Sequence, residues 1–117
     1  YIRGAHNESI YFVGGPEEQN WARVGEFARV LEAVQRGPLH YRLADNLPYG
    51  RAWNTLEGPP RSFGRWTAAQ PNIRVGTSIE IPYANVGETT VTAENARAFG
   101  HDLARALAQY LPLRIAD

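Results

Sequence analysis

The sequence contains no cysteine, no methionine and no lysine, and it lacks long apolar runs. The absence of cysteine excludes disulfides and thiolate metal sites. A membrane-spanning helix needs about 20 consecutive, mostly apolar residues, so we expect neither such a helix nor a membrane partner. Because there is no methionine at all, we expect the chain to be a processed product or a fragment of a longer protein.

The charged residues balance, with 12 basic and 12 acidic side chains, and every basic one is arginine. A chain without net charge has no general attraction for phosphate backbones, so we expect no nucleic-acid partner. Apolar residues make up 44% of the sequence, which is enough to form a packed core. A length of 117 residues fits one domain or a large part of one.

Two segments have the periodicity of helices. Residues 16–36 begin with a proline, which suits the first helical position because its missing N–H would be unpaired there. Their apolar residues recur at spacings of three and four, and Gly37 is expected to stop the helix. In residues 92–111, Thr92 is a good N-cap and Pro112 is expected to end the helix.

Three further segments have the composition of strands. Residues 9–13 are apolar β-formers followed by two glycines, and residues 39–43 form a second, shorter candidate. Residues 73–81 are predicted to be a central strand covered on both faces. The order strand, helix, loop, strand, helix predicts an α/β fold, in which helices pack on a mixed or parallel sheet. Residues 38–72 otherwise show no sustained period and are predicted to be mostly irregular.

Glu80 is an acidic residue within an otherwise β-branched run. A carboxylate is costly to bury without a partner. Pro82 ends the predicted strand, so Glu80 would lie near the strand's carboxyl end, where open α/β sheets bind ligands. Two interpretations stay open from the residues alone: a functional carboxylate, or a structural one paired with an arginine.

The motifs of common catalytic sites are absent. There is no phosphate-binding loop, no G-x-S-x-G turn and no H-E-x-x-H pair. The three histidines lie far apart in the sequence. We expect His40 and His101 to be structural or on the surface, which leaves His6 as the histidine that could line a site.

Three stretches resemble a known family. T-S-I-E-I-P-Y-A-N, at residues 77–85, and V-T-A-E-N-A-R-A-F-G-H-D-L-A-R-A-L, at residues 91–107, are similar to the end of bacterial zinc-carboxypeptidase-like proteins of the metallocarboxypeptidase superfamily. The opening Y-I-R-G-A-H-N-E-S-I-Y-F-V-G resembles the segment that follows the family's third zinc ligand. The resemblance implies that residues 1–117 are one unit, the C-terminal part of a larger catalytic domain with a zinc-carboxypeptidase-like fold.

The resemblance also implies an activity. Glu80 would be the general base of a zinc-dependent hydrolase that cleaves a peptide or related amide bond in a peptide or acyl-amino-acid substrate. Tyr49, Ser78 and Tyr83 would contact that substrate. The family's H-x-x-E zinc motif does not occur here, so zinc is expected in the full-length protein and none in this chain alone, which would be inactive.

Assembly and function each have an alternative. A sheet cut from a larger domain leaves an open edge, so we expect the chain to dock onto its missing N-terminal half or to self-associate. An inactive family member would be a non-catalytic module that binds a peptide or glycan, with Trp21, Trp53 and Trp66 as a stacking platform.

Overall fold

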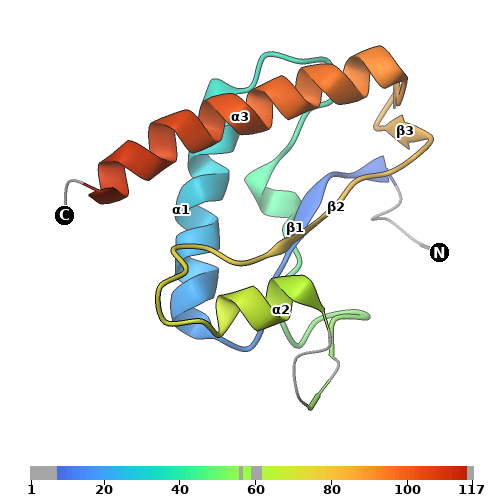
Figure 1. Ribbon diagram of the computed structural model, residues 1–117. Coiled ribbons are helices and arrows are strands. Elements are labelled where there is room, and N and C mark those ends of the chain that lie inside the picture. The colour runs from blue at the N-terminus through green and yellow to red at the C-terminus, as the bar shows by residue number, and fades with distance from the viewer. Residues whose placement is uncertain (1–7, 56, 59–61, 116–117) are drawn as a thin grey trace.

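The computed structural model describes residues 8–55, 57–58 and 62–115, with no side-chain description for residues 112–115. Within these ranges the chain is a mixed α/β structure with three α-helices and two small antiparallel sheets. The elements follow in the order β1 (Tyr11–Val13), α1 (Glu18–Val34), the 3-10 turn η2 (Leu43–Asp45), α2 (Phe63–Ala68), β2 (Ser78–Glu80), β3 (Asn85–Val86), β4 (Thr89–Thr90) and α3 (Ala93–Ile115). Figure 1 shows α3 crossing the C-terminal end of α1, with α2 near its other end.

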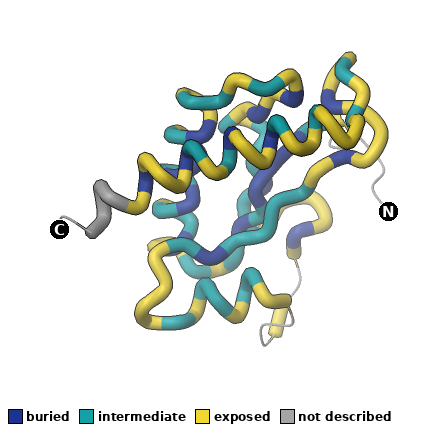
Figure 2. Tube along the Cα trace, turned by 45° about the horizontal axis from the view of Figure 1, so that its top comes forward, coloured by how far each residue is buried: buried dark blue, intermediate teal, exposed yellow. Residues whose placement is uncertain are grey.

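The core lies where α1 meets the β1–β2 pair and α3. Helix α1 buries Val24, Phe27 and Leu31, at the spacing that places side chains on one helix face. The Phe27 ring is in edge contact with Phe12 of β1, at 5.8 Å between centroids, and with Tyr110 of α3, at 5.6 Å. One aromatic side chain therefore joins the sheet to both long helices, and the buried segments converge on this region in Figure 2.

The α/β class is confirmed, but the main sheet is antiparallel, so the predicted mixed or parallel sheet is wrong. Strands β1 and β2 pair with Tyr11 opposite Glu80 and Phe12 opposite Ile79. The Phe12 N–H donates to Asn46 Oδ1 at 3.0 Å, and its carbonyl accepts from the Leu47 N–H at 2.9 Å, both away from β2. Phe12 and Ile79 are therefore a non-hydrogen-bonded pair, and the Ile79 backbone groups point to the far edge of β2.

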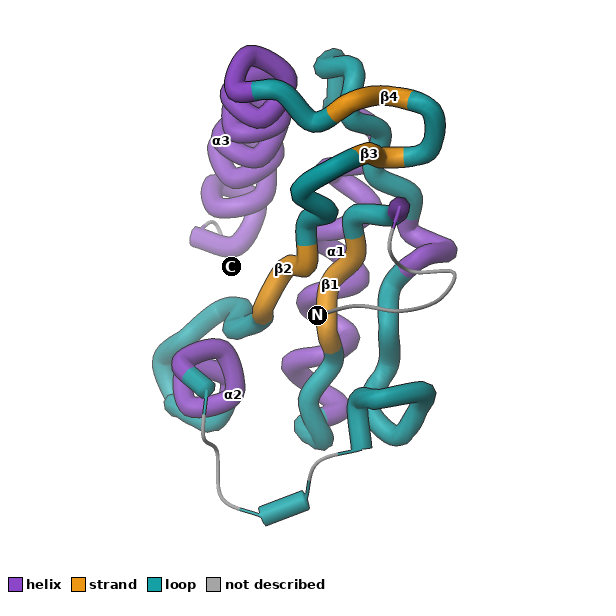
Figure 3. The backbone as a smooth tube through the Cα atoms, turned by 90° about the vertical axis from the view of Figure 1, so that its right-hand side faces the viewer, coloured by secondary structure: helices purple, strands orange, loops and turns teal. Residues whose placement is uncertain are grey.

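Parallel pairing with β1 is limited to a single bridge in the described ranges. After α1 the chain returns to β1, and Leu47 forms a parallel bridge with Val13, in which the Gly14 N–H donates to the Leu47 carbonyl at 2.8 Å. The next N–H that could face β1 is that of Tyr49, but the Gly14 carbonyl that it would reach accepts instead from the Asn54 side-chain amide at 2.7 Å, so the ladder ends there. The chain then turns away, and β2 arrives on the opposite side of β1 in the reverse direction (Figure 3).

Residues 39–43 do not form the predicted strand. The side-chain amide of Gln35 donates to the Tyr41 carbonyl at 2.8 Å and accepts from the Tyr41 N–H at 2.8 Å. A neighbouring strand would have made these same two bonds. The backbone N–H and carbonyl of Tyr41 are therefore hydrogen-bonded without a sheet. Leu43 begins η2 instead.

The strand predicted over residues 73–81 is shorter and less covered than expected. Only Ser78–Glu80 is extended and paired, and among the described residues its sole strand partner is β1. Ile73 and Ile81 are 38% and 41% exposed. The prediction of a central strand covered on both faces is therefore wrong for this chain: β2 lies at an edge.

The two long helices are confirmed, with one boundary corrected. Thr92 caps α3 as predicted, because its hydroxyl accepts a hydrogen bond from the Asn95 N–H at 3.1 Å. Helix α3 then continues through Pro112 to Ile115 instead of ending before the proline. Pro112 has no N–H to donate to the carbonyl of Ala108, four residues earlier. Ala108 is exposed, so that carbonyl can bond to water instead. None of the helices in the described ranges is long and apolar enough to cross a membrane.

Asp102 of α3 joins the two long helices. Its carboxylate is 1% exposed and accepts hydrogen bonds from the Arg36 and Gly37 N–H groups, at 2.8 and 2.9 Å, just after α1 ends. Arg105, one turn further along α3, donates to it at 2.9 Å. A Cβ at Gly37 would lie 3.0 Å from Asp102 Oδ2, so this close approach favours glycine.

Replacing Asp102 with alanine should therefore destabilise the fold. We expect Asp102→Ala to lower the free energy of unfolding by about 2–3 kcal/mol, since partly buried donors and a guanidinium lose their acceptor. Asp45 is the control: it pairs with Arg42, whose side chain is 70% exposed. Asp45→Ala should cost less than about 1 kcal/mol. Equal losses in urea denaturation would contradict the role of Asp102.

The open edge of β2 predicts assembly. The Ile79 backbone groups have no backbone partner in the described ranges, and Ile81, at the end of β2, is 41% exposed. Light scattering should show association that rises with concentration, because unpaired strand edges recruit further strands. Ile81→Lys should weaken it, whereas Ile73→Lys, at similar exposure but away from the edge, should not. A monomer at every concentration would contradict this prediction.

Candidate functional site

A cavity of about 250 Å³ lies between the β1–β2 pair, α2 and the turn around Trp53. In an antiparallel pair, opposite residues share a face and neighbours alternate. Phe12 and Ile79 therefore point into the core, whereas Ser78 and Glu80 point to the cavity side. The lining residues are Val13, Gly14, Gly15, Trp53, Asn54, Ser62, Gly64, Arg65, Ala68, Gly76, Thr77, Ser78 and Glu80.

Helix α2 forms one wall of the cavity because two glycines allow it to approach β2. A Cβ at Gly64 would lie 2.7 Å from Ser78 Oγ, and one at Gly76 would lie 2.5 Å from the Ala68 amide nitrogen. Real side chains do not tolerate such distances, so bulkier residues at either position would push α2 away. Ser62 caps this short helix by accepting a hydrogen bond from the Arg65 N–H at 3.2 Å.

Asn20 of α1 fixes the backbone beneath the cavity. Its buried amide donates to the Gly76 carbonyl at 2.6 Å and accepts from the Gly76 N–H at 2.9 Å. These reciprocal bonds hold the approach to β2 in place, two residues before Ser78. The first helix thus positions the strand that carries Glu80.

A tight turn at residues 50–54 forms the opposite wall. The Gly50 N–H donates to the Asn54 carbonyl at 2.8 Å, and the Asn54 N–H donates to the Arg51 carbonyl at 2.9 Å. The buried Asn54 amide also donates to the Gly14 carbonyl at 2.7 Å, which ties the turn to the end of β1. The turn presents Trp53 with 53% of its surface exposed.

Tyr11 lies beneath the rim, beside both Trp53 and Glu80. It is fully buried, and it faces Glu80 across the strand pair. Burial raises the pKa of Tyr11, the neighbouring Trp53 side chain lowers it, and the nearby Glu80 carboxylate raises it. The net rise keeps the phenol neutral at physiological pH, so Glu80 has an uncharged polar neighbour.

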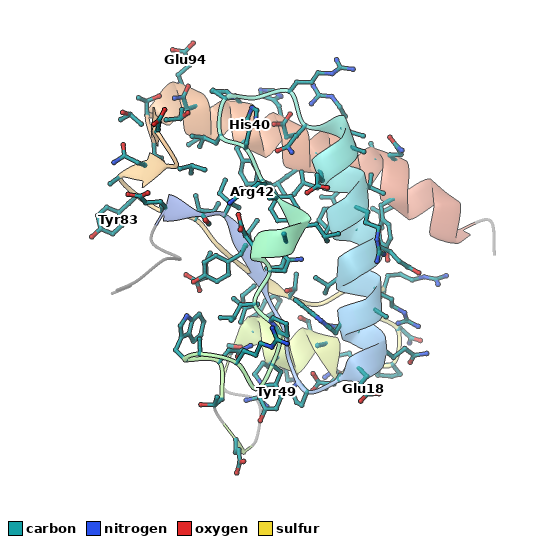
Figure 4. All side chains as sticks on the ribbon, turned by 180° about the vertical axis from the view of Figure 1, so that it is seen from behind. Glu18, His40, Arg42, Tyr49, Tyr83 and Glu94 are labelled. Carbon is teal, nitrogen blue, oxygen red and sulfur yellow. The ribbon has the colours of Figure 1, made fainter. Side chains whose placement is uncertain are left out.

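The structure brings together two of the four predicted site residues. Ser78 and Glu80 both line the cavity, but Tyr49 and Tyr83 do not. Tyr83 is 89% exposed beyond the end of β2. Figure 4 shows Tyr49 near the start of α1 and Tyr83 at the opposite end of the molecule, beside β3. The predicted substrate contacts of these two tyrosines stay predictions.

The histidines do not gather at this cavity. His40 and His101 are exposed, in agreement with the expectation for them, and His6 lies outside the described residues. His40 borders a separate, more polar hollow of about 420 Å³ with Glu8 and Arg42.

Trp53 was predicted only as part of an aromatic platform with Trp21 and Trp66, and other residues that build the cavity carried no signal in the sequence. Trp53, Asn54 and Gly76 were not predicted to act together. Gly76 and Ser78 are the one local hint, because they interrupt a run that is otherwise rich in β-branched residues. The rest depends on contacts between distant segments: 56 residues separate Asn20 from Gly76 and 40 separate Gly14 from Asn54.

The described residues do not form a zinc site. No group of three or more histidine, cysteine, aspartate or glutamate side chains in those ranges could hold a metal ion. The oxygen atoms near the cavity that could ligate zinc belong to hydroxyl groups and to the single carboxylate of Glu80.

No family model, curated protein or solved structure matches this chain.

Zinc titration tests the ligand set directly. We expect isothermal calorimetry of the chain with zinc to show weak binding or none, since a tight site needs three or four converging protein ligands. A stoichiometric, tight site would contradict this expectation. In that event His6→Ala and Glu80→Ala, compared with His101→Ala as a control, would locate the ligands.

Proposed function

We propose that this chain is the C-terminal part of a zinc-dependent, carboxypeptidase-like hydrolase that cleaves a peptide or related amide bond, with Glu80 as general base. The observation that supports the proposal most is the position of the Glu80 carboxylate. It borders the cavity beside Ser78 and Trp53 instead of lying in the core. The T-S-I-E-I-P sequence around it supplies the resemblance to the family.

The surroundings of Glu80 suit proton transfer. Within the described residues, no salt bridge and no hydrogen bond occupies its carboxylate; the two ion pairs there are Arg42–Asp45 and Arg105–Asp102. The structural alternative required an arginine partner for Glu80. A carboxylate without a partner can approach a water molecule or an amide group in the cavity and accept a proton from it. The half-buried strand holds its backbone in a fixed direction.

The metal-holding part of the enzyme would come from elsewhere. Because the described residues do not hold zinc, we propose that an N-terminal part of the same polypeptide supplies its ligands. The open edge of β2 is the place for that part to dock, since its backbone groups can accept another strand next to Glu80. The isolated chain would then lack activity.

A binding module is the second candidate, and exposed aromatic side chains favour it. Phe63 and Trp66 of α2 are 78% and 51% exposed, and their rings stack at 5.9 Å between centroids. Exposed aromatic rings of this kind can hold a peptide or a sugar without chemistry. Activity measurements distinguish the two functions.

Glu80→Gln is the decisive variant in the full-length protein. Glutamine keeps the shape and the hydrogen-bonding capacity but cannot accept the proton. Turnover of a panel of acyl-amino acids and C-terminal peptides should fall by about 10²–10⁴-fold. The melting temperature should stay unchanged. Glu94→Gln is the control, because Glu94 is an exposed carboxylate in the first turn of α3.

Two results would count against the assignment. If Glu80→Gln kept full activity and melted at a lower temperature, Glu80 would be a structural residue. If the unmodified full-length protein cleaved no amide in the panel, the binding module would replace the hydrolase.

A further inference from the structure

The turn that carries Trp53 stores backbone strain. Ala52 has a φ of 49°, in the left-handed region that a Cβ disfavours, and it is the one residue other than glycine with positive φ in the described ranges. Such a conformation costs about 1 kcal/mol or more in a non-glycine residue. The turn persists because Asn54 anchors it to Gly14 at 2.7 Å. Trp53 is the side chain that this strained turn presents to the cavity.

Trp53 is not used in packing the core. It is 53% exposed and borders the cavity. Trp66 is similarly exposed, at 51%, but its ring already stacks on Phe63. Among the described aromatic side chains, no ring stacks on Trp53 or meets it edge to face. The bond from Asn54 to Gly14 holds the turn in place, so Trp53 presents an aromatic surface beside the cavity.

The dimensions and the charges of the cavity limit what can fill that space. A volume of about 250 Å³ is below the roughly 300–1,000 Å³ of pockets that enclose whole drug-sized ligands. It suits a single side chain. Glu80 and Arg65 both border it, so an anionic group would meet the carboxylate and a cationic group the guanidinium. A neutral group avoids both conflicts.

We propose that Trp53 is a specificity-determining wall of this cavity and that the cavity binds an uncharged aromatic side chain of the ligand, stacked on the indole. The assignment of that side chain to the residue next to the cleaved amide rests on the proposed function. The binding itself does not depend on Glu80 acting as a base.

Calorimetric or NMR titration of the chain with N-acetylated amino acids tests this proposal. N-acetylphenylalanine should bind more tightly than N-acetylalanine, N-acetylglutamate and N-acetyllysine. Trp53→Ala should weaken N-acetylphenylalanine binding by about tenfold, as expected for loss of an aromatic stack and its buried area. Trp53→Phe should restore most of the affinity. Trp66→Ala, the matched control, should change it by less than about twofold.

Three outcomes would overturn the proposal: no saturable binding of N-acetylphenylalanine, tighter binding of a charged probe, or equal losses in the Trp53 and Trp66 variants. Circular dichroism shows whether Trp53→Ala is still folded, and recovery of binding in Trp53→Phe shows that the loss came from the missing aromatic contact. Glu80→Gln should still bind N-acetylphenylalanine. If the full-length protein binds N-acetylphenylalanine but hydrolyses no substrate, the proposed activity is wrong and the stacking role of Trp53 stands. If it hydrolyses substrates equally well with and without Trp53, the stacking role is wrong and the proposed activity stands.

Discussion

The pairing of β1 with β2 is the constraint on which the core and the cavity both depend. Side chains alternate along a strand, so the register that sets Phe12 against Ile79 in the core also sets Tyr11 against Glu80 on the cavity side. The bonds of Phe12 to Asn46 and Leu47 fix which edge of β1 is used for β2. A shift of one residue would bring the carboxylate toward the helices and expose the isoleucine, so the burial energy of the core also maintains the position of the site.

Most of the surrounding structure holds that pair in place. Helix α1 packs on it through Phe27 and reaches the approach to β2 through the Asn20 amide. Asp102 then joins α1 to α3 through a carboxylate that is 1% exposed. A buried acceptor such as this one contributes more to stability than an exposed ion pair does, because its donors have little water to replace it. The polar contacts that matter for the fold are therefore few and buried.

The sequence predicted the long helices well and the sheet poorly, for identifiable reasons. Periodicity and the Thr92 cap locate α1 and α3 from local information. The direction of the sheet depends instead on Gln35, whose side chain replaces a strand partner, and on a bridge at Leu47 that goes no further. Glu80 was identified because a carboxylate in a β-branched run is unusual. Trp53 was predicted only as part of an aromatic platform with Trp21 and Trp66, since the left-handed alanine that directs it to the cavity leaves no mark in the sequence.

The most direct test of this account is the register of the β1–β2 pair in solution. In a non-hydrogen-bonded antiparallel pair the Cα atoms are only about 4.5 Å apart, which brings the two Hα atoms into close contact. A strong Hα–Hα nuclear Overhauser effect between Phe12 and Ile79 is therefore expected in the NMR spectrum of the chain. A strong effect between Phe12 and Glu80 instead, or none between these segments, would place Glu80 away from the cavity and contradict the account.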